Sequence, residues 1–357
     1  MKKVLISIFC LLVSQINQAQ EKENKSFLVD FSGYVDVYYL YSLNKPHTND
    51  YSPYAYAYNR HDELNLNLGF VKAAFQGDRV FASFALQSGS YAKANYAAEP
   101  SEYRSIAEAN LGFKLNDKIT IDAGVLPSHI GIESATGSDC YNLTRSINAD
   151  GSPYFETGAR IKYAVNENIE VSGLILNGWQ TIEENNNDKS LGTQIYFSKN
   201  DKLAINYSTY YGNDVPKGSP KQPWFFHDLS IEIQDIFPNF KAVLVVDQMY
   251  KNQLTGGGYD QMTTGVLQGY YEAKKFGIGA RVEHYNDPNE VVNSSGTTNG
   301  FQTTSASLNL DFPIKEKMLW RIEGRYFDSK DAIFLTEKIG TFSNVMSVVS
   351  TSLSVKF

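Results

Sequence analysis

The segment VLPSHIGIESATGSDCYNLTRSINADGSPYFETGARIKY, Val125–Tyr163, joins a long irregular stretch to a strand signature. Pro127–Pro153 shows no strand or helix period, and irregular connections of this length are uncommon in compact domains and usually functional. The segment then alternates, with Phe155, Thr157, Ala159, Ile161 and Tyr163 on one face and Glu156, Gly158, Arg160 and Lys162 on the other. Because successive side chains of a strand point to opposite faces, the alternation over residues 155–163 predicts a strand with one charged face.

The same alternation recurs along the chain. Residues 318–327, MLWRIEGRYF, place Trp320, Ile322, Gly324 and Tyr326 opposite Arg321, Glu323 and Arg325. Aromatic residues make up 13% of the chain, a composition that suits strands. We predict about sixteen strands: Phe27–Leu43, Asp62–Gln76, Arg79–Ser88, Ser105–Leu115, Lys118–Leu126, Tyr154–Ala164, Asn168–Gly178, Ser190–Ser198, Lys202–Gly212, Trp224–Ile236, Phe240–Tyr250, Tyr259–Ala273, Lys275–Asn286, Phe301–Phe312, Lys317–Phe327 and Ser343–Phe357.

The strand lengths and the connections both indicate a membrane barrel. Most of the strands have about nine to thirteen residues, which is enough for a tilted strand to cross a bilayer. Short turns such as Gln76–Arg79 and Lys199–Lys202 alternate with long connections: Asn44–His61, Gly89–Arg104, Pro127–Pro153, Trp179–Lys189, Asn213–Pro223, Lys251–Gly258, Asp287–Gly300 and Asp328–Phe342. This predicts an all-β, transmembrane antiparallel up-and-down β-barrel with short periplasmic turns and long extracellular loops.

The first residues indicate export. Lys2 and Lys3 precede the apolar run Val4–Val13, and small and polar residues follow, as in a secretory signal peptide. The apolar run is too short to span a membrane as a helix. We expect cleavage after Ala19, which leaves a single outer-membrane barrel domain over residues 20–357. Two bulky residues precede Cys10, which disfavours a lipoprotein signal.

Charge and cysteine content exclude several classes of protein. The chain carries 32 Lys and Arg against 39 Asp and Glu, and loss of two lysines with residues 1–19 changes the net charge from −7 to −9. An acidic exported chain is a poor nucleic-acid binder, because phosphate contacts need clustered cations. Cys140 is the one cysteine after residue 19, so an intramolecular disulfide cannot form. No later apolar run approaches the roughly 18 residues of a membrane helix.

Aromatic residues and the C-terminus add to the barrel interpretation. Tyrosines near strand ends are expected to form girdles at the membrane interfaces, in contact with outer-membrane lipid and lipopolysaccharide. The candidates are Tyr38, Tyr39, Tyr41, Tyr210 and Tyr211. The last strand ends in Phe357, which is similar to the terminal signal that the barrel assembly machinery recognises in outer-membrane proteins.

The sequence resembles the OmpL-like β-barrel porin family of Gram-negative outer membranes. The segments that carry the resemblance are FSGYVDVYYLY, LPSHIGIESA, LTRSINADGSPYFETGARIKY, LILNGWQ, FFHDL, RVEHYNDP and LWRIEGRYF, which spread over nearly the whole chain. The resemblance implies a porin in the cell outer membrane, a passive channel for small hydrophilic solutes or ions. The resemblance implies no catalytic or ligand-binding residues for this chain. A homo-trimer is possible, but the sequence does not mark a subunit interface.

A barrel of about sixteen strands leaves an aqueous channel that something must narrow. By resemblance to general porins, Pro127–Pro153 is expected to fold into the lumen; the alternative is an ordinary extracellular loop. Opposed charges across a narrow water path would then select solutes. The candidates are Glu133, Asp139 and Arg145 in this connection and Arg160, Arg281, Glu283, Arg321, Glu323 and Arg325 on the wall. Alternatively these charges are merely solvated, or paired with Glu156, Glu283 and Glu323.

Two other functions remain open at this stage. A substrate-specific channel for sugars or anions could use aromatic residues such as Tyr34 and Tyr38, although both faces of that first strand are rich in tyrosine. A barrel-type hydrolase would need a nucleophile, a histidine and a carboxylate in one site. Ser128 adjoins His129 in sequence, but neighbours on a strand point to opposite faces, and no G-x-S-x-G motif occurs. We therefore expect no enzymatic activity, no cofactor and no metal site.

Overall fold

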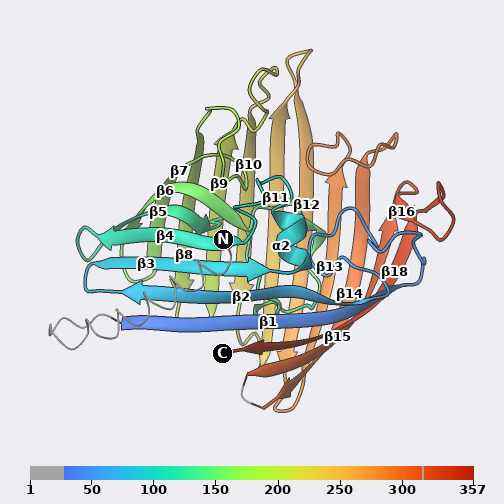
Figure 1. The fold of residues 1–357 in the computed structure, drawn as a ribbon, viewed down its shortest axis with the longest axis horizontal. Coiled ribbons are helices and arrows are strands. Elements are labelled where there is room, and N and C mark those ends of the chain that lie inside the picture. The colour runs from blue at the N-terminus through green and yellow to red at the C-terminus, as the bar shows by residue number, and fades with distance from the viewer. Residues whose placement is uncertain (1–27, 316) are drawn as a thin grey trace.

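Sixteen long strands close into an antiparallel barrel in the computed structural model, which describes residues 28–315 and 317–357 (Figure 1). They are β1 Leu28–Ser42, β2 Leu64–Gln76, β3 Val80–Ser88, β4 Ile106–Lys114, β5 Ile119–Pro127, β6 Phe155–Ala164, β7 Ile169–Leu176, β8 Ser190–Lys199, β9 Leu203–Gly212, β10 Trp224–Ile233, β11 Phe240–Asn252, β12 Tyr259–Glu272, β13 Gly277–Asp287, β14 Phe301–Ile314, β15 Met318–Ser329 and β18 Val345–Lys356. The predicted fold class and all sixteen predicted strands are confirmed. The expected signal peptide lies outside the described residues.

The first and last long strands close the barrel. β1 pairs with β18 from Tyr34 opposite Lys356 to Ser42 opposite Val348, and with β2 on its other side. Beyond that register, Gly33 and Phe357 exchange backbone hydrogen bonds of 2.8 and 3.0 Å. Each of the other long strands pairs with its neighbours in the meander, so no long strand presents a free edge. A closed sheet is what a bilayer requires, because lipid cannot satisfy unpaired backbone groups.

The two faces of the wall differ as the alternation predicts. Leu267 lies opposite Val282 on the outer face, where their exposed fractions are 58% and 57%. One position along, Gln268 lies opposite Arg281 on the inner face, and both are buried. Large exposed apolar side chains cover the outside of the other strands as well, for example Leu111. A continuous apolar exterior of this kind fits contact with lipid rather than with water.

The expectation for two tyrosines is wrong. Tyr39 and Tyr211 are exposed on the outer face, but Tyr38 and Tyr210 point inward and are buried, so they cannot belong to an interfacial girdle. Tyr34 also points inward and is buried, which resolves the ambiguous face of β1. The error has a simple origin, since a shift of one residue along a strand moves a side chain to the opposite face.

The long connections contain short elements that the sequence pattern did not predict. They are α2 Ser90–Asn95, the 3-10 helix η1 Gly137–Asp139, α3 Ile147–Asp150, and a small hairpin of β16 Phe334–Leu335 and β17 Phe342–Ser343. α3 begins after Ser146, whose hydroxyl accepts a 3.0 Å hydrogen bond from the backbone N–H of Ala149, as an N-cap does. Within the described part of the chain, no helix is both long and apolar enough to cross a membrane.

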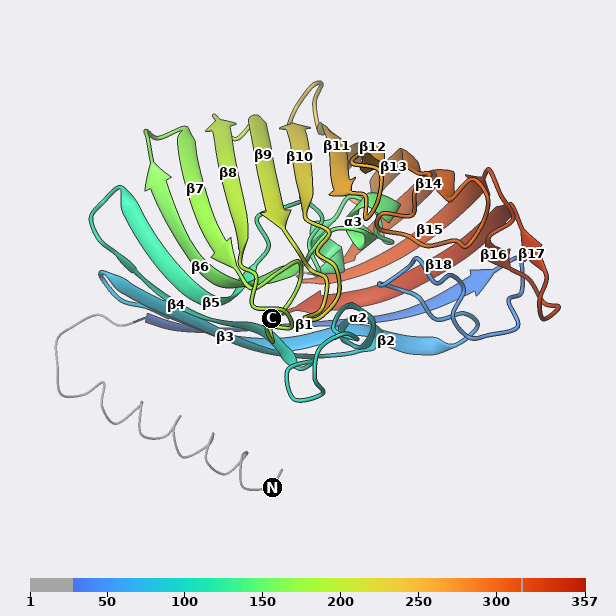
Figure 2. The same cartoon turned by 90° about the horizontal axis from the view of Figure 1, so that it is seen from above.

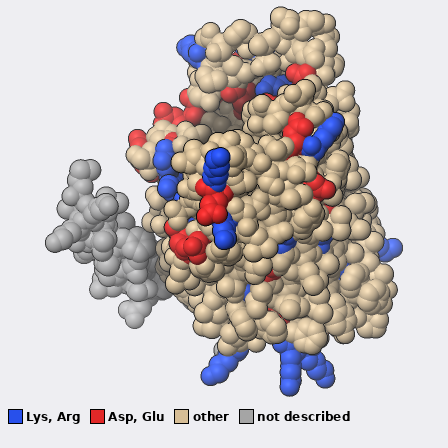
Figure 3. Space-filling model, turned by 90° about the vertical axis from the view of Figure 1, so that its right-hand side faces the viewer, with Lys and Arg blue, Asp and Glu red and all other residues tan. Residues whose placement is uncertain are grey.

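Two of the short turns carry exposed lysines. Lys274 and Lys275 lie between β12 and β13, Lys315 and Lys317 lie between β14 and β15, and all four are exposed. Figure 3 shows Lys and Arg side chains projecting from the lower edge of the molecule. Long cationic side chains in the turns at the end of the barrel can keep their charge in water or near lipid headgroups, while their aliphatic stems cover apolar surface.

Candidate functional site

The connection Ser128–Tyr154, called the interior loop below, lies among inward-facing side chains of opposite walls. On the β1 side, its Ser138 N–H donates to the Tyr34 hydroxyl at 3.2 Å. Its Thr144 N–H donates to a carboxylate oxygen of Glu323 on β15, two strands from β1, at 2.5 Å. On the β9 side, eight strands from β1 around the barrel, the Ser208 hydroxyl donates to the His129 carbonyl of the loop at 2.6 Å. Figure 2 shows α3 of this loop within the outline of the barrel. The interior loop therefore crosses the barrel instead of extending away from its mouth.

Arg321 binds the interior loop through its backbone. The guanidinium is buried on the inner face of β15 and pairs with both carboxylate oxygens of Asp311, at 2.8 and 3.0 Å. It also donates to four loop carbonyl oxygens: Gly137 at 2.8 Å, Cys140 at 2.9 Å, and Tyr141 and Asn142 at 3.1 Å each. The fork of N–H donors on arginine suits this role, because it satisfies several buried acceptors at once.

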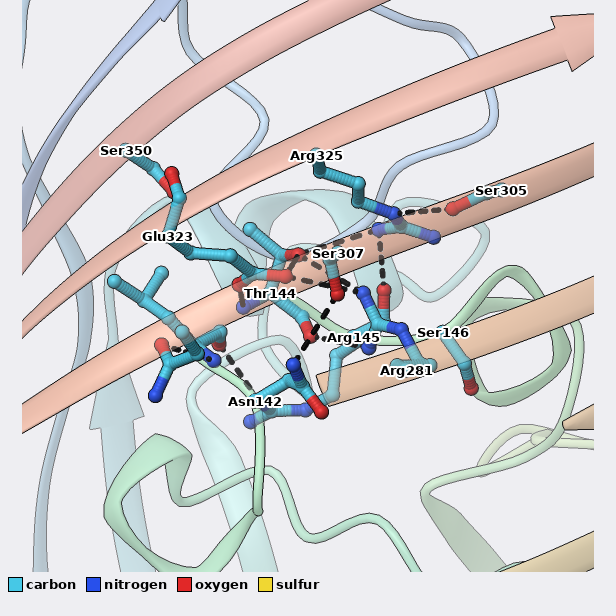
Figure 4. Close-up of polar contacts among 12 residues, drawn as sticks. Asn142, Thr144, Arg145, Ser146, Arg281, Ser305, Ser307, Glu323, Arg325 and Ser350 are labelled. Carbon is cyan, nitrogen blue, oxygen red and sulfur yellow. Dashed lines mark hydrogen bonds and ion pairs between the residues drawn. The ribbon is translucent and has the colours of Figure 1, made fainter. Parts of the chain in front are cut away.

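The other charged residues of β13 and β15 continue this attachment (Figure 4). Arg325 forms an ion pair with Glu283, and Arg281 lies 3.3 Å from Glu323. Three further contacts reach the loop backbone: Arg281 to the Thr144 carbonyl at 2.7 Å, Arg325 to the Arg145 carbonyl at 2.7 Å, and the Ile147 N–H to Glu283 at 2.6 Å. All these wall residues are buried. They lie between the barrel wall and the loop, and their role in permeation remains a proposal.

The three loop candidates occupy different surroundings. Glu133 accepts hydrogen bonds from the Ser146 N–H at 3.0 Å and from the Gln268 amide at 2.7 Å. Arg145 is buried and donates to the Ala135 carbonyl at 2.8 Å, so it stabilises the shape of the loop itself. Asp139 is more exposed and pairs with Lys356 at the end of β18.

Arg160 lies apart from this cluster. It pairs with Asp122 of the neighbouring strand β5 at 2.7 Å. Glu156, on the same strand as Arg160, pairs with His129 of the interior loop, with 2.8 Å between the carboxylate and Nδ1. The structure therefore brings together Arg281, Glu283, Arg321, Glu323 and Arg325 with the loop, but not Arg160.

Another side of the interior loop borders a cavity of about 360 Å³. Pro127 of β5 and the first part of the loop, from Ser128 to Thr136, form one side of the cavity, and the inner faces of β2, β3 and β4 form the other. The aromatic rings of Phe70, Tyr91, Tyr96 and Tyr154 line it together with Gln87, Glu108 and Glu133. Of these, only Glu133 was a candidate from the sequence. The others come from separate strands and loops, and no local motif links them.

Sequence reasoning also missed the importance of Asp150. Asp150 is partly buried at the end of α3, and burial raises the pKa of its carboxyl to about 8, although nearby Arg325 and Arg145 lower that pKa. One carboxylate oxygen has no hydrogen-bond partner. A buried carboxyl in such surroundings favours its neutral form.

The histidines are engaged in structural contacts. Both ring nitrogens of His129 are occupied, Nδ1 by Glu156 at 2.8 Å and Nε2 by the Thr209 carbonyl at 2.9 Å. Ser128 accepts a hydrogen bond from the Ile130 N–H, and its sequence neighbour His129 has no free nitrogen to activate it. Among the described residues, no group of three or more His, Cys, Asp or Glu is arranged to hold a metal ion.

Comparison with solved structures identifies the same architecture in outer-membrane channels. The outer membrane channel DcaP of Acinetobacter baumannii aligns with a TM-score of 0.62 and 12% identity over 94% of this chain and 99% of its own. The anion-selective porin from Comamonas acidovorans aligns with a TM-score of 0.61 and 10% identity over 93% and 100%. A trimer form of OmpT from Vibrio cholerae aligns with a TM-score of 0.59 and 10% identity over 93% and 100%. At these identities the likeness shows the fold alone.

No curated protein matches the sequence. The family described as "Putative beta-barrel porin-2, OmpL-like" matches residues 28–357, which include every strand of the barrel. This chain belongs to that family and is a porin of the outer membrane.

Proposed function

We propose that this porin is a passive, water-filled diffusion channel for small hydrophilic solutes, and that the interior loop narrows it. The observation that carries the proposal is the attachment of this loop to opposite walls, through Tyr34 of β1 on one side and Ser208 of β9 on the other. The solute path runs beside the loop, through the cavity along β2, β3 and β4. A loop held across a wide barrel reduces its open cross-section and brings polar groups close to the solute.

In this proposal the buried arginines act through the loop rather than by facing the solute. Arg281, Arg321 and Arg325 hold the loop backbone, which leaves Glu108 and Glu133 as the charged residues that line the path. Lys72 donates to both carboxylate oxygens of Glu108 at 2.8 Å. With that pair balanced, Glu133 gives the path a negative bias, so we expect it to disfavour anions.

We further propose that residues 1–19 are the export signal and that the channel has no enzymatic activity. Its partners are membrane lipid and lipopolysaccharide on the apolar wall and the barrel assembly machinery at Phe357, whose side chain is exposed. A homo-trimer is the assembly that we propose, and the trimer form of a structural neighbour supports it.

Planar bilayer recording tests this function. The purified barrel is expected to give discrete ion-conducting steps and to migrate as a heat-modifiable band. A folded, membrane-inserted protein that carries no current would refute the channel. Lipase and protease assays on the same preparation test the absence of catalysis, and turnover that depends on His129 would contradict it.

A further inference from the structure

We propose that a groove on the outer wall of the barrel binds an anionic phospholipid, with an acyl chain in the groove and the phosphate beside a patch of lysines in the short turns. The inference deepens the proposed contact of the apolar wall with membrane lipid. It rests on that part of the proposed function and not on permeation. It adds the class of lipid, one with a net negative headgroup, and its place on the wall.

The groove crosses the outer faces of β14, β15, β18, β1 and β2, where the barrel closes. Its volume is about 440 Å³, within the usual range of roughly 300–1,000 Å³ for ligand sites. Five outward-facing apolar or aromatic side chains line it, and each is at least 36% exposed: Tyr39, Leu64, Ile314, Trp320 and Leu353. These side chains are open to the membrane, so an acyl chain can pack directly against them.

Trp320 forms a rigid part of the groove. Its indole N–H donates to the Thr351 hydroxyl at 2.9 Å, and its ring lies beside that of Phe312, with the centroids 5.1 Å apart. Across the strand pair, Trp320 lies opposite Leu353. A ring held in this way loses little conformational freedom when a lipid packs on it. Tryptophan is also the residue type favoured where the apolar part of a membrane meets the headgroups.

Two lysines continue from the end of the groove. Ile314, which lines the groove, is the last residue of β14 and directly precedes Lys315. Met318, the first residue of β15, lies opposite Ile314 and directly follows Lys317. Both lysines are exposed. Their ammonium groups can therefore meet a phosphate while the acyl chain of the same lipid follows the apolar groove.

The neighbouring turn adds two more cations. It connects β12 to β13, which pairs with β14, and it carries two exposed lysines. An acidic residue at this turn, Glu272, lies 3.1 Å from Lys241 and is compensated by it. Glu316 is the one acidic residue in the other turn. The lysine patch therefore has an excess of positive charge, which complements an anionic headgroup. Its members are Lys274, Lys275, Lys315 and Lys317.

An anionic phospholipid accounts for the groove and the lysine patch together. A soluble anion would use the lysines but leave the apolar groove empty. A zwitterionic lipid would fill the groove, but its own cationic group would be repelled by the lysines. The short turns lie at the periplasmic end of the barrel, so the lipid belongs to the membrane leaflet on that side.

Quenching of tryptophan fluorescence by brominated phospholipids tests the site in reconstituted phosphatidylcholine vesicles. Of the three tryptophans of the chain, Trp320 is on the outer wall, whereas Trp179 and Trp224 pack against the buried side chain of Tyr210. Brominated phosphatidylglycerol should bind beside Trp320 at least roughly fivefold more tightly than brominated phosphatidylcholine, the effect of one lysine near a headgroup. Added salt should reduce this preference, because it screens the attraction.

A fourfold variant removes the lysine patch and should abolish the preference for phosphatidylglycerol: Lys274→Gln, Lys275→Gln, Lys315→Gln and Lys317→Gln. The matched control removes four exposed lysines from the long connections at the other end of the barrel and should behave like the wild type: Lys45→Gln, Lys217→Gln, Lys330→Gln and Lys338→Gln. Heat-modifiable migration shows whether each variant has folded. The salt titration of the wild type decides the question without any variant.

Equal binding of the two lipids, a preference that salt does not reduce, or an equal loss in both variants would overturn the lipid site. Absence of quenching by either lipid would show that a second copy of the barrel covers the groove, and would overturn the site as well. These measurements do not depend on ion current. A conducting channel without lipid preference loses only this inference, whereas a lipid preference without current refutes the proposed channel and leaves the lipid site.

Discussion

Replacement of Arg321 by methionine should release the interior loop from the barrel wall. The substitution keeps an unbranched side chain of similar length but removes the guanidinium donors to Asp311 and to the four loop carbonyls. Breaking a buried ion pair by removing one partner typically costs about 3–5 kcal/mol. Released carbonyls can bind water in the widened lumen, so the low end, about 3 kcal/mol, is the appropriate magnitude for undocking of the loop.

The loss of docking free energy can be measured through the reactivity of the Cys140 thiol. The thiol is buried in the interior loop, donates to the Ser134 carbonyl, and is the only cysteine in residues 20–357. If a maleimide reacts only with the undocked loop, the labelling rate follows the undocked fraction. A loss of about 3 kcal/mol then raises that rate by roughly two orders of magnitude, because 1.4 kcal/mol corresponds to a factor of ten. Single-channel conductance should rise with it.

Arg160→Met is the control, since it removes a partly buried arginine whose partner is Asp122 and not the loop. The double variant Arg321→Met, Asp311→Asn also removes the carboxylate charge that the single variant leaves unpaired on the wall. Heat-modifiable migration on a gel shows whether the barrel of each variant has folded. An unchanged labelling rate in Arg321→Met, or an equal increase in Arg160→Met, would show that Arg321 does not hold the loop.

Two further predictions concern the loop and the wall. Burial raises the pKa of Asp150 from 3.8 to about 8, so the docked loop binds a proton that the undocked loop has lost; docking should weaken as the pH rises from about 4 to about 8 and level off above that. Current fluctuations should increase over this range in the wild type but not in Asp150→Asn, and an identical profile in both would exclude Asp150 as the cause. Gly124 has a φ of 125°, and a Cβ there would lie 2.1 Å from the Ala109 carbonyl oxygen. Gly124→Ala should therefore cost at least about 1–3 kcal/mol of barrel stability through backbone strain, whereas Gly265→Ala, with nothing within 4 Å, should be tolerated; equal unfolding temperatures would contradict this.

The barrel could be predicted from the sequence because its determinants are local. Alternation along a strand such as Met318–Ser329 depends on neighbouring residues only, and each long strand pairs mainly with the next one in the chain. Short turns such as Gln76–Arg79 impose that pairing. The one-residue errors at Tyr38 and Tyr210 occurred where both faces of a strand carry tyrosine, so that the pattern no longer distinguishes inside from outside.

The site depends on contacts that no local pattern records. The sequence by itself placed Arg321 on the polar face of its strand and Pro127–Pro153 in the longest connection. Only the tertiary structure brought them together, because Arg321 recognises loop carbonyl oxygens about 180 positions away, and every residue type carries a carbonyl. The cavity likewise combines Tyr91, Glu108 and Tyr154 from separate elements. Periodicity reveals which face a side chain occupies, whereas packing across a closed barrel decides what that side chain meets.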